Sequence, residues 1–196
     1  MHYLKIMKIK LLVFILFFGS LGFAFRGMQN AKNKITENDY FDFINAITSS
    51  WTKSLNPNQL SVMSNKPAID EIYADTILIY KDPSFSKRDI GSLRKQLSAN
   101  KGYTWPKAKL INYRILAQTD IDGIINGSND GWKDFSKKYG NAYYVYSVPL
   151  FSFDKKRCII AAGQVCGAKC AKGSVVLYTK EGNDWKKTKE YGSWKE

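Results

Sequence analysis

The residues of this chain whose type and spacing best suit chemistry are its three cysteines. Cys166 and Cys170 flank residues 167–169, with strand-like sequence on both sides. If these strands form a hairpin, the two Cα atoms lie about 5 Å apart, a distance that a disulfide can bridge. We therefore expect a Cys166–Cys170 disulfide. A bridge that uses Cys158 and three free thiols are the alternatives. Cys158 lies in an apolar strand, where we expect a buried free thiol.

Metal and nucleophile chemistry lack the partners they need. His2 is the only histidine, and it falls in a segment that we expect to be removed. Zinc would need a fourth ligand beside the cysteines, and a nucleophilic cysteine would need a base. A redox role would favour a CxxC motif near a βαβ unit, which the chain does not have. We therefore predict no catalytic residue, no metal ligand and no cofactor.

Carboxylates, serines and lysines are the acid–base groups that remain. A glycosidase needs two carboxyl groups about 5 to 9 Å apart in a groove. The carboxylate pairs that are close in sequence are Asp120 with Asp122 and Asp70 with Glu71. The Ser–Lys neighbours considered are Lys53 with Ser54 and Ser86 with Lys87. The carboxylates resemble turn or surface residues and the serines lie in no nucleophile motif, so the sequence favours a non-enzyme.

The segment 119–131 is rich in Asp, Asn, Gly and Ser, as calcium loops are. An EF-hand loop that began at Asp120 would place Ile124 at the fifth position, where an oxygen ligand is needed. One that began at Asn126 would place Lys137 at the twelfth position, where a glutamate is needed. The segment is therefore predicted to form turns.

The first 24 residues read as an export signal. Lys5, Lys8 and Lys10 precede an apolar run of about 15 residues, which is shorter than the roughly 20 that span a bilayer. The small residues Gly22 and Ala24 predict cleavage after Ala24. An uncleaved anchor or a buried helix are the alternatives. Cleavage would send the protein to a periplasmic or extracellular location, with no transmembrane segment left in the mature chain.

The composition indicates one basic domain. Residues 25–35 read as a flexible lead and residues 36–196 as a single domain. Residues 131–196 contain 13 basic and 6 acidic residues. Such a surface could meet an acidic envelope component or a protein. The basic residues are mostly lysine rather than the arginine that grips phosphate with two hydrogen bonds, and the chain is exported, so no nucleic acid is expected.

Apolar spacing predicts helices in three places. The first begins at Thr36 as N-cap, ends at 56–58, and carries a stripe made of Tyr40, Ile44, Ile47, Trp51 and Leu55. The second covers 86–99, with an inner face made of Ile90, Leu93 and Leu97. The third is short and carries Trp132, Phe135 and Tyr139 on one face.

Strand-like runs follow these helices. We predict strands at 76–80 and 110–116, the latter with Ile111, Tyr113 and Ile115 on one side. Four more cover 142–153, 157–166, 173–179 and 185–194; residues 60–73 are ambiguous. Short turns make the last four an antiparallel meander. The predicted class is α+β: N-terminal helices pack on one face of an antiparallel sheet that ends in this meander, and residues 131–196 supply a helix plus the meander.

Aromatic, glycine and cysteine residues recur at fixed places in the C-terminal third. They are Gly131-Trp132, Phe135, Tyr139, Ser147, Phe151-Ser152, Cys166-Gly167, Cys170, Gly173, Lys180, Trp185 and Trp194. This series resembles an uncharacterised family of small exported bacterial proteins over residues 131–194. The resemblance implies a β-meander and export, and implies no activity.

Three functional hypotheses follow. The first and favoured one is a non-catalytic binding or envelope-associated module, because of the export signal, the missing histidine and the basic C-terminal half. The second is a hydrolase that uses carboxylates or a Ser–Lys pair instead of histidine. The third is an inhibitor or immunity-like protein that binds a protein partner, which would show an exposed apolar patch.

Overall fold

The computed structural model describes residues 34–52, 61–107 and 110–196. The predicted export signal with His2, its cleavage after Ala24, most of the lead 25–35 and the predicted helix end at 56–58 lie outside these residues. Residues Thr36–Glu196 form one compact unit.

The first described helix, α2, runs from Glu37 to Thr52. The carboxylate of Asp39 accepts hydrogen bonds from the backbone N–H (2.6 Å) and hydroxyl (2.9 Å) of Thr36, which secures the helix start. Ile44 and Ile47 of the predicted stripe are buried, and so is Phe43, which the stripe did not include; Leu55 lies outside the described residues.

The segment 76–80, predicted to be a strand, is helical. Helix α3 covers Ile69–Ala74 and α4 covers Thr76–Lys81. In α4 only Ile79 is buried, while Ile77 and Leu78 are 66% and 52% exposed. A short apolar run does not distinguish a buried strand from a helix with one inner face, and the strand assignment was wrong for that reason.

Helix α5, Lys87–Ala99, forms where the sequence predicts a helix and begins with a capping box that was not predicted. The hydroxyl of Ser86 accepts a hydrogen bond from the backbone N–H of Asp89, and the Asp89 carboxylate accepts one from the backbone N–H of Ser86. The inner residues Leu93 and Leu97 are buried, as expected.

The segment 119–131 differs from its prediction, because most of it forms helix α6, Gln118–Asn126, rather than turns. Ile121 is fully buried on this helix, which explains why it folds against the sheet despite its polar composition. Helix α7, Gly131–Tyr139, follows where it is predicted, and ends at Gly140, whose φ of 95° favours glycine.

The seven strands found in the described residues form one mixed sheet with the order β2-β1-β3-β5-β6-β7, and β4 pairs with β5. Their bounds are β1 Ser61–Ser64, β2 Tyr113–Leu116, β3 Tyr143–Tyr146, β4 Leu150–Phe151, β5 Arg157–Gly167, β6 Cys170–Glu181 and β7 Asp184–Lys195. Strands β3, β5, β6 and β7 form the predicted antiparallel meander.

The rest of the sheet corrects the prediction. Strand β1 pairs in parallel with both β2 and β3, so the sheet is mixed rather than antiparallel. Strand β2 is shorter than the predicted 110–116, and Ile111, predicted to share a face with Tyr113 and Ile115, is 76% exposed. The α+β class holds, while the purely antiparallel sheet does not.

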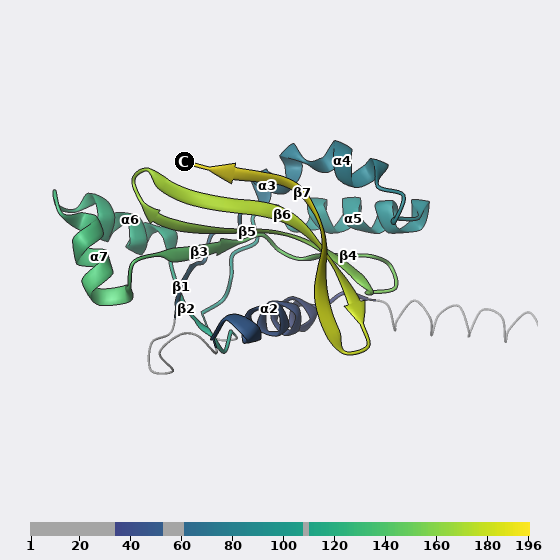
Figure 1. The fold of residues 1–196 in the computed structure, drawn as a ribbon, viewed down its shortest axis with the longest axis horizontal. Helices are drawn as coiled ribbons and strands as arrows, with labels where there is room; N and C mark the ends of the chain where they lie inside the picture. Colours follow the sequence, from purple (N-terminus) through teal and green to yellow (C-terminus); the bar gives the residue numbers. More distant parts are fainter. Residues whose placement is uncertain (1–33, 53–60, 108–109) are drawn as a thin grey trace, which may run out of the picture. The chain divides into compact units, whose positions relative to one another are not determined.

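Helices cover both faces of the sheet rather than one (Figure 1). We call one side the α5 face, where Ile159, Val175 and Leu177 pack with α3, α4 and α5. The neighbouring residue Tyr178 points to the opposite side, which we call the α2 face, and its ring lies 5.5 Å from that of Phe43 on α2. Because α2 covers only part of its face, the other part is left to line a site.

Candidate functional site

A groove of about 400 Å³ lies on the α2 face, across strands β3, β5, β6 and β7. This volume falls in the range of small-molecule pockets. Two cross-strand rows of side chains line it. The first row consists of Tyr144, Gln164, Lys172 and Lys195, and the second of Tyr146, Ala162, Ser174 and Ser193. Residues paired across antiparallel strands point to the same side, so each row lies on one face of the sheet.

The second row explains why the sheet is hollowed here. Ala162, Ser174 and Ser193 are small, whereas the next residues along β5 and β6 on this face are the buried Ile160 and Val176. The groove therefore lies where the large core side chains end and small ones begin.

Buried tyrosines form the β3 end of the groove. Tyr146 is 1% exposed, and its hydroxyl lies 2.7 Å from that of Tyr113 on β2. Burial raises the pKa of Tyr113 to about 12 and that of Tyr146 well above its ordinary value, so both are neutral at pH 7. The ring of Tyr144 makes a T-shaped contact with Tyr113 at 5.6 Å, which fixes its orientation.

Five polar side chains in the groove are left without a partner. They are Gln164, Lys172, Ser174, Ser193 and Lys195, and none of their side chains makes a hydrogen bond or ion pair within the parts of the chain that the structure describes. Donors and acceptors gathered at one hollow and unused by the fold are available to a ligand.

Lys172 and Lys195 are also a like-charged pair. They stand directly opposite each other on β6 and β7, where side chains lie about 5 Å apart at Cβ. Like charges at such positions destabilise a sheet. The carboxylate in the groove lining does not offset them, because Glu190 is paired with Lys187 at 2.6 Å. The pair therefore costs the fold stability and leaves a positive site in the groove.

A tryptophan stiffens the sheet behind the groove. The indole of Trp194 lies over Gly173, where an added Cβ would overlap it, and over Gly163, where an added Cβ would be 3.0 Å away. Gly163, Gly173 and Trp194 stand opposite one another on β5, β6 and β7. The glycines thus let a large ring pack flat against the α5 face of the sheet, on the side opposite to the two rows of the groove.

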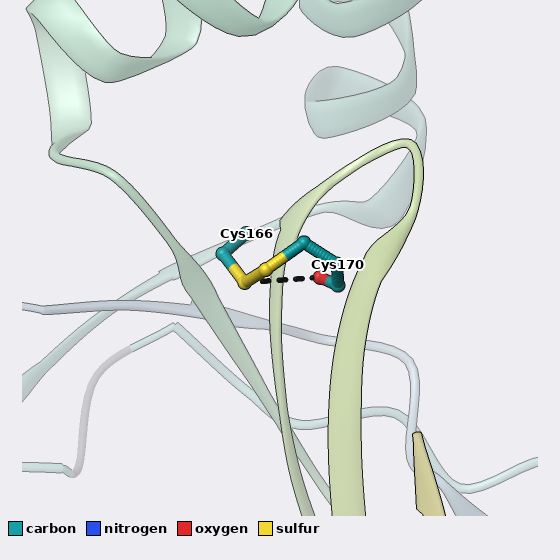
Figure 2. Close-up of a disulfide and its surroundings, with 2 residues drawn as sticks. All are labelled: Cys166 and Cys170. Atoms are coloured by element: carbon teal, nitrogen blue, oxygen red, sulfur yellow. Dashed lines mark hydrogen bonds between the residues drawn. A yellow bond between two sulfur atoms is a disulfide. The ribbon is translucent and has the colours of Figure 1, made fainter. Parts of the chain in front are cut away.

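The disulfide lies next to the groove. Cys166 and Cys170 are joined across the end of the β5–β6 hairpin, with Cα atoms 5.0 Å apart, as their spacing predicts (Figure 2). Each cysteine lies two residues closer to the hairpin turn than Gln164 on β5 or Lys172 on β6. The bond therefore closes the hairpin beside the first row. Cys158 is a buried free thiol, which is also the expected state.

The other residues singled out from the sequence do not meet at a site. Asp120 and Asp122 are exposed on α6, and residues two apart do not face each other on a helix. Asp70 and Glu71 occupy the first turn of α3. Ser86 is the N-cap of α5. Lys53 and Ser54 lie outside the described residues.

Sequence reasoning missed the groove and all of its polar residues. Its signal in the sequence is the pair Lys172 and Ser174 at alternate positions of β6, just before the apolar stretch 175–177 of the same strand. No part of the described chain contains a helix long and apolar enough to cross a membrane.

Comparisons with known proteins give no identity. No family model matches the chain, and no curated protein and no solved structure gave a match. The resemblance of residues 131–194 to exported bacterial proteins therefore stays a prediction, and the groove itself is the evidence on function.

Proposed function

We propose that this protein is an exported, non-catalytic binding module that holds an anionic ligand in the groove. The observation that carries the proposal is the pair Lys172 and Lys195, opposite each other, exposed, and without an acidic partner in the described chain. A fold gains nothing from this arrangement, whereas an anion placed between the two ammonium groups would be bound by both.

The groove offers little to catalysis. Within the described residues its one carboxylate, Glu190, already forms an ion pair, and its tyrosine hydroxyl at Tyr146 is buried against Tyr113. Acid hydrolysis of the glycosidase kind needs two free carboxyl groups that face each other. The groove thus lacks the pair of carboxyl groups that a glycosidase needs.

The test compares two double variants that each remove two positive charges. In K172Q/K195Q the groove loses its cations, while in K133Q/K137Q the loss falls on α7, where both lysines form surface ion pairs. A panel of carboxylated, sulfated and phosphorylated probes is titrated against each protein by calorimetry. We expect at least one probe to bind the groove variant about tenfold more weakly than the wild type and the control.

Unfolding of the same variants provides the check on structure. Because the lysines repel each other, K172Q/K195Q should be as stable as the wild type or more stable by about 0.2–1 kcal/mol. If every probe binds both double variants as well as it binds the wild type, the groove is not the binding site. If K172Q/K195Q unfolds more easily than the wild type, the two lysines do not repel each other, and the observation that carries the proposal is lost.

A second candidate is a protein that binds a partner through α4. The exposed apolar side chains of Ile77 and Leu78, with Tyr73 at 37% exposure on α3, favour it. The variant I77S/L78S should then lose a stoichiometric partner that the wild type retains through gel filtration, without any change in groove binding. Retention of that partner by the variant would rule out the α4 surface.

A further inference from the structure

We infer that the ligand of the groove is an acidic saccharide: a sugar ring that carries a carboxylate, sulfate or phosphate group. This inference rests on the proposed function and names the ligand class for the same site. It follows from three kinds of side chain that the sheet register brings together: a cation pair, neutral hydrogen-bonding groups and an aromatic ring.

The cation pair selects for charge. Lys172 on β6 and Lys195 on β7 are the last two residues of the first row, and β7 is the last strand in the sheet order. Both are exposed, so the anionic group need not be buried to reach them. The edge position also leaves the groove open at this end, which allows a longer polymer to continue past Lys195.

The neutral polar groups suit sugar hydroxyls. Gln164, Ser174 and Ser193 each carry a group that can donate and accept hydrogen bonds, as a sugar hydroxyl can. A carboxylate or a phosphate can only accept from them, so an anion alone would leave their acceptor atoms unused. Their positions one strand apart spread the contacts along the groove.

The aromatic ring suits the apolar face of a sugar. Tyr144 is half-buried and stands in the same row as Gln164 and the lysines. Its ring is held by the contact with Tyr113, so it presents a fixed flat surface and loses little conformational entropy on binding. The first row thus offers an aromatic ring, an amide and two cations in that order from β3 to β7. This order matches a sugar whose charged substituent points to β7.

The net charge of the region favours the same ligand at longer range. The C-terminal residues 131–196 contain 13 basic and 6 acidic residues. An acidic polysaccharide would be attracted before contact, and this attraction would weaken as salt rises.

The experiment titrates the full chain with five probes and follows binding by calorimetry. The saccharides are a galacturonic acid trisaccharide, the neutral galactose trisaccharide and a sulfated galactose trisaccharide. The non-saccharide anions are a glutamic acid hexapeptide and vesicles of phosphatidylglycerol. We expect an acidic trisaccharide to bind about tenfold more tightly than the neutral one. The variant K172Q/K195Q should abolish this difference, and Y144A should weaken the binding of all three saccharides.

Preference for the galacturonic or the sulfated sugar identifies the anionic group and supports the inference either way. If the hexapeptide or the vesicles bind as tightly as the best saccharide and need the same two lysines, the ligand class is wrong while the groove remains the binding site. If no probe depends on Lys172 and Lys195, the inference and the proposed function fail together.

Discussion

The replacement of Asp82 by asparagine should destabilise the fold more than any other single isosteric change near β7. Asp82 follows α4, and its side chain is only 4% exposed. One carboxylate oxygen accepts hydrogen bonds from the N–H and hydroxyl of Ser84, and the other accepts from Lys189 (2.7 Å) and Tyr191 (2.9 Å) on β7. The carboxylate thus ties the edge strand, which carries Lys195, to the helical layer.

The magnitude follows from the bonds that asparagine cannot make. Its carbonyl oxygen keeps the Ser84 contacts, while its amide group replaces the acceptor of Lys189 and Tyr191. Hydrogen bonds to a charged group contribute about 1.5–3 kcal/mol each, and the value for Lys189 is reduced because that side chain is 48% exposed. We expect D82N to lower the free energy of unfolding by about 2–3 kcal/mol, and the melting temperature by about 4–12 °C.

The effect has a pH signature. Burial alone would raise the pKa of Asp82, but the hydrogen bonds from Lys189, Ser84 and Tyr191 hold it well below its ordinary value. A lowered carboxyl pKa contributes stability that is complete above the unfolded value of about 3.9 and is lost as the pH falls through the folded value. The difference between wild type and D82N should therefore be constant from pH 7 to about pH 5 and shrink below about pH 4.

Urea unfolding followed by circular dichroism measures both effects. The control is D134N on α7, where Asp134 forms an exposed ion pair with Lys137 at 3.6 Å and should contribute less than about 0.5 kcal/mol. A D82N protein that unfolds within about 0.5 kcal/mol of the wild type, or a difference that does not change between pH 7 and pH 2, would refute the role of this carboxylate.

Three further predictions concern the sheet. G173A should destabilise by about 1–3 kcal/mol and alter tryptophan fluorescence, because the new Cβ would displace the indole of Trp194; an unchanged spectrum and stability would contradict that packing. The double variant of Cys166 and Cys170 to serine should lose about 2 kcal/mol by the chain-entropy model for so short a loop, and equal stability of oxidised and reduced wild type would contradict it. Above about pH 10 the fold should lose stability because burial raises the pKa of Tyr113 to about 12, and Y113F should reduce this loss; phenolate absorbance that rises well before near-ultraviolet dichroism falls would argue against it.

Local signals in the sequence predicted the local structure well. Thr36 was predicted as the N-cap of the first helix, and α2 begins at the next residue, with Thr36 bonded to the carboxylate of Asp39. Cys166 and Cys170 also depend on local geometry, because one hairpin turn decides their distance. The error at Thr76–Lys81 arose where a five-residue apolar run had no period to separate a strand from a helix.

Pairing between distant segments could not be predicted in the same way. Nothing in residues 61–64 shows that they pair in parallel with both β2 and β3. A parallel pair has no connecting turn to set its register, so the mixed sheet was beyond the sequence pattern.

The groove depends on two irregularities in the β6–β7 hairpin. Near its turn Lys180 pairs with Trp185, and an unbroken register from there would place Lys172 opposite Ser193. Register shifts after Leu177 and after Val175 move the partner to Lys195. The like-charged pair therefore exists only because of bulges, whose positions a pattern of alternating side chains does not reveal.

The most direct test of the central claim is amide chemical-shift mapping of the ¹⁵N-labelled chain during titration with the galacturonic acid trisaccharide. Binding in the groove predicts saturable shifts clustered at Gln164, Lys172, Ser174, Ser193 and Lys195, with little change on α4 or α7, and their loss in K172Q/K195Q. Shifts that are scattered over the exposed lysines, or clustered away from β6 and β7, or equally large in K172Q/K195Q, would contradict it.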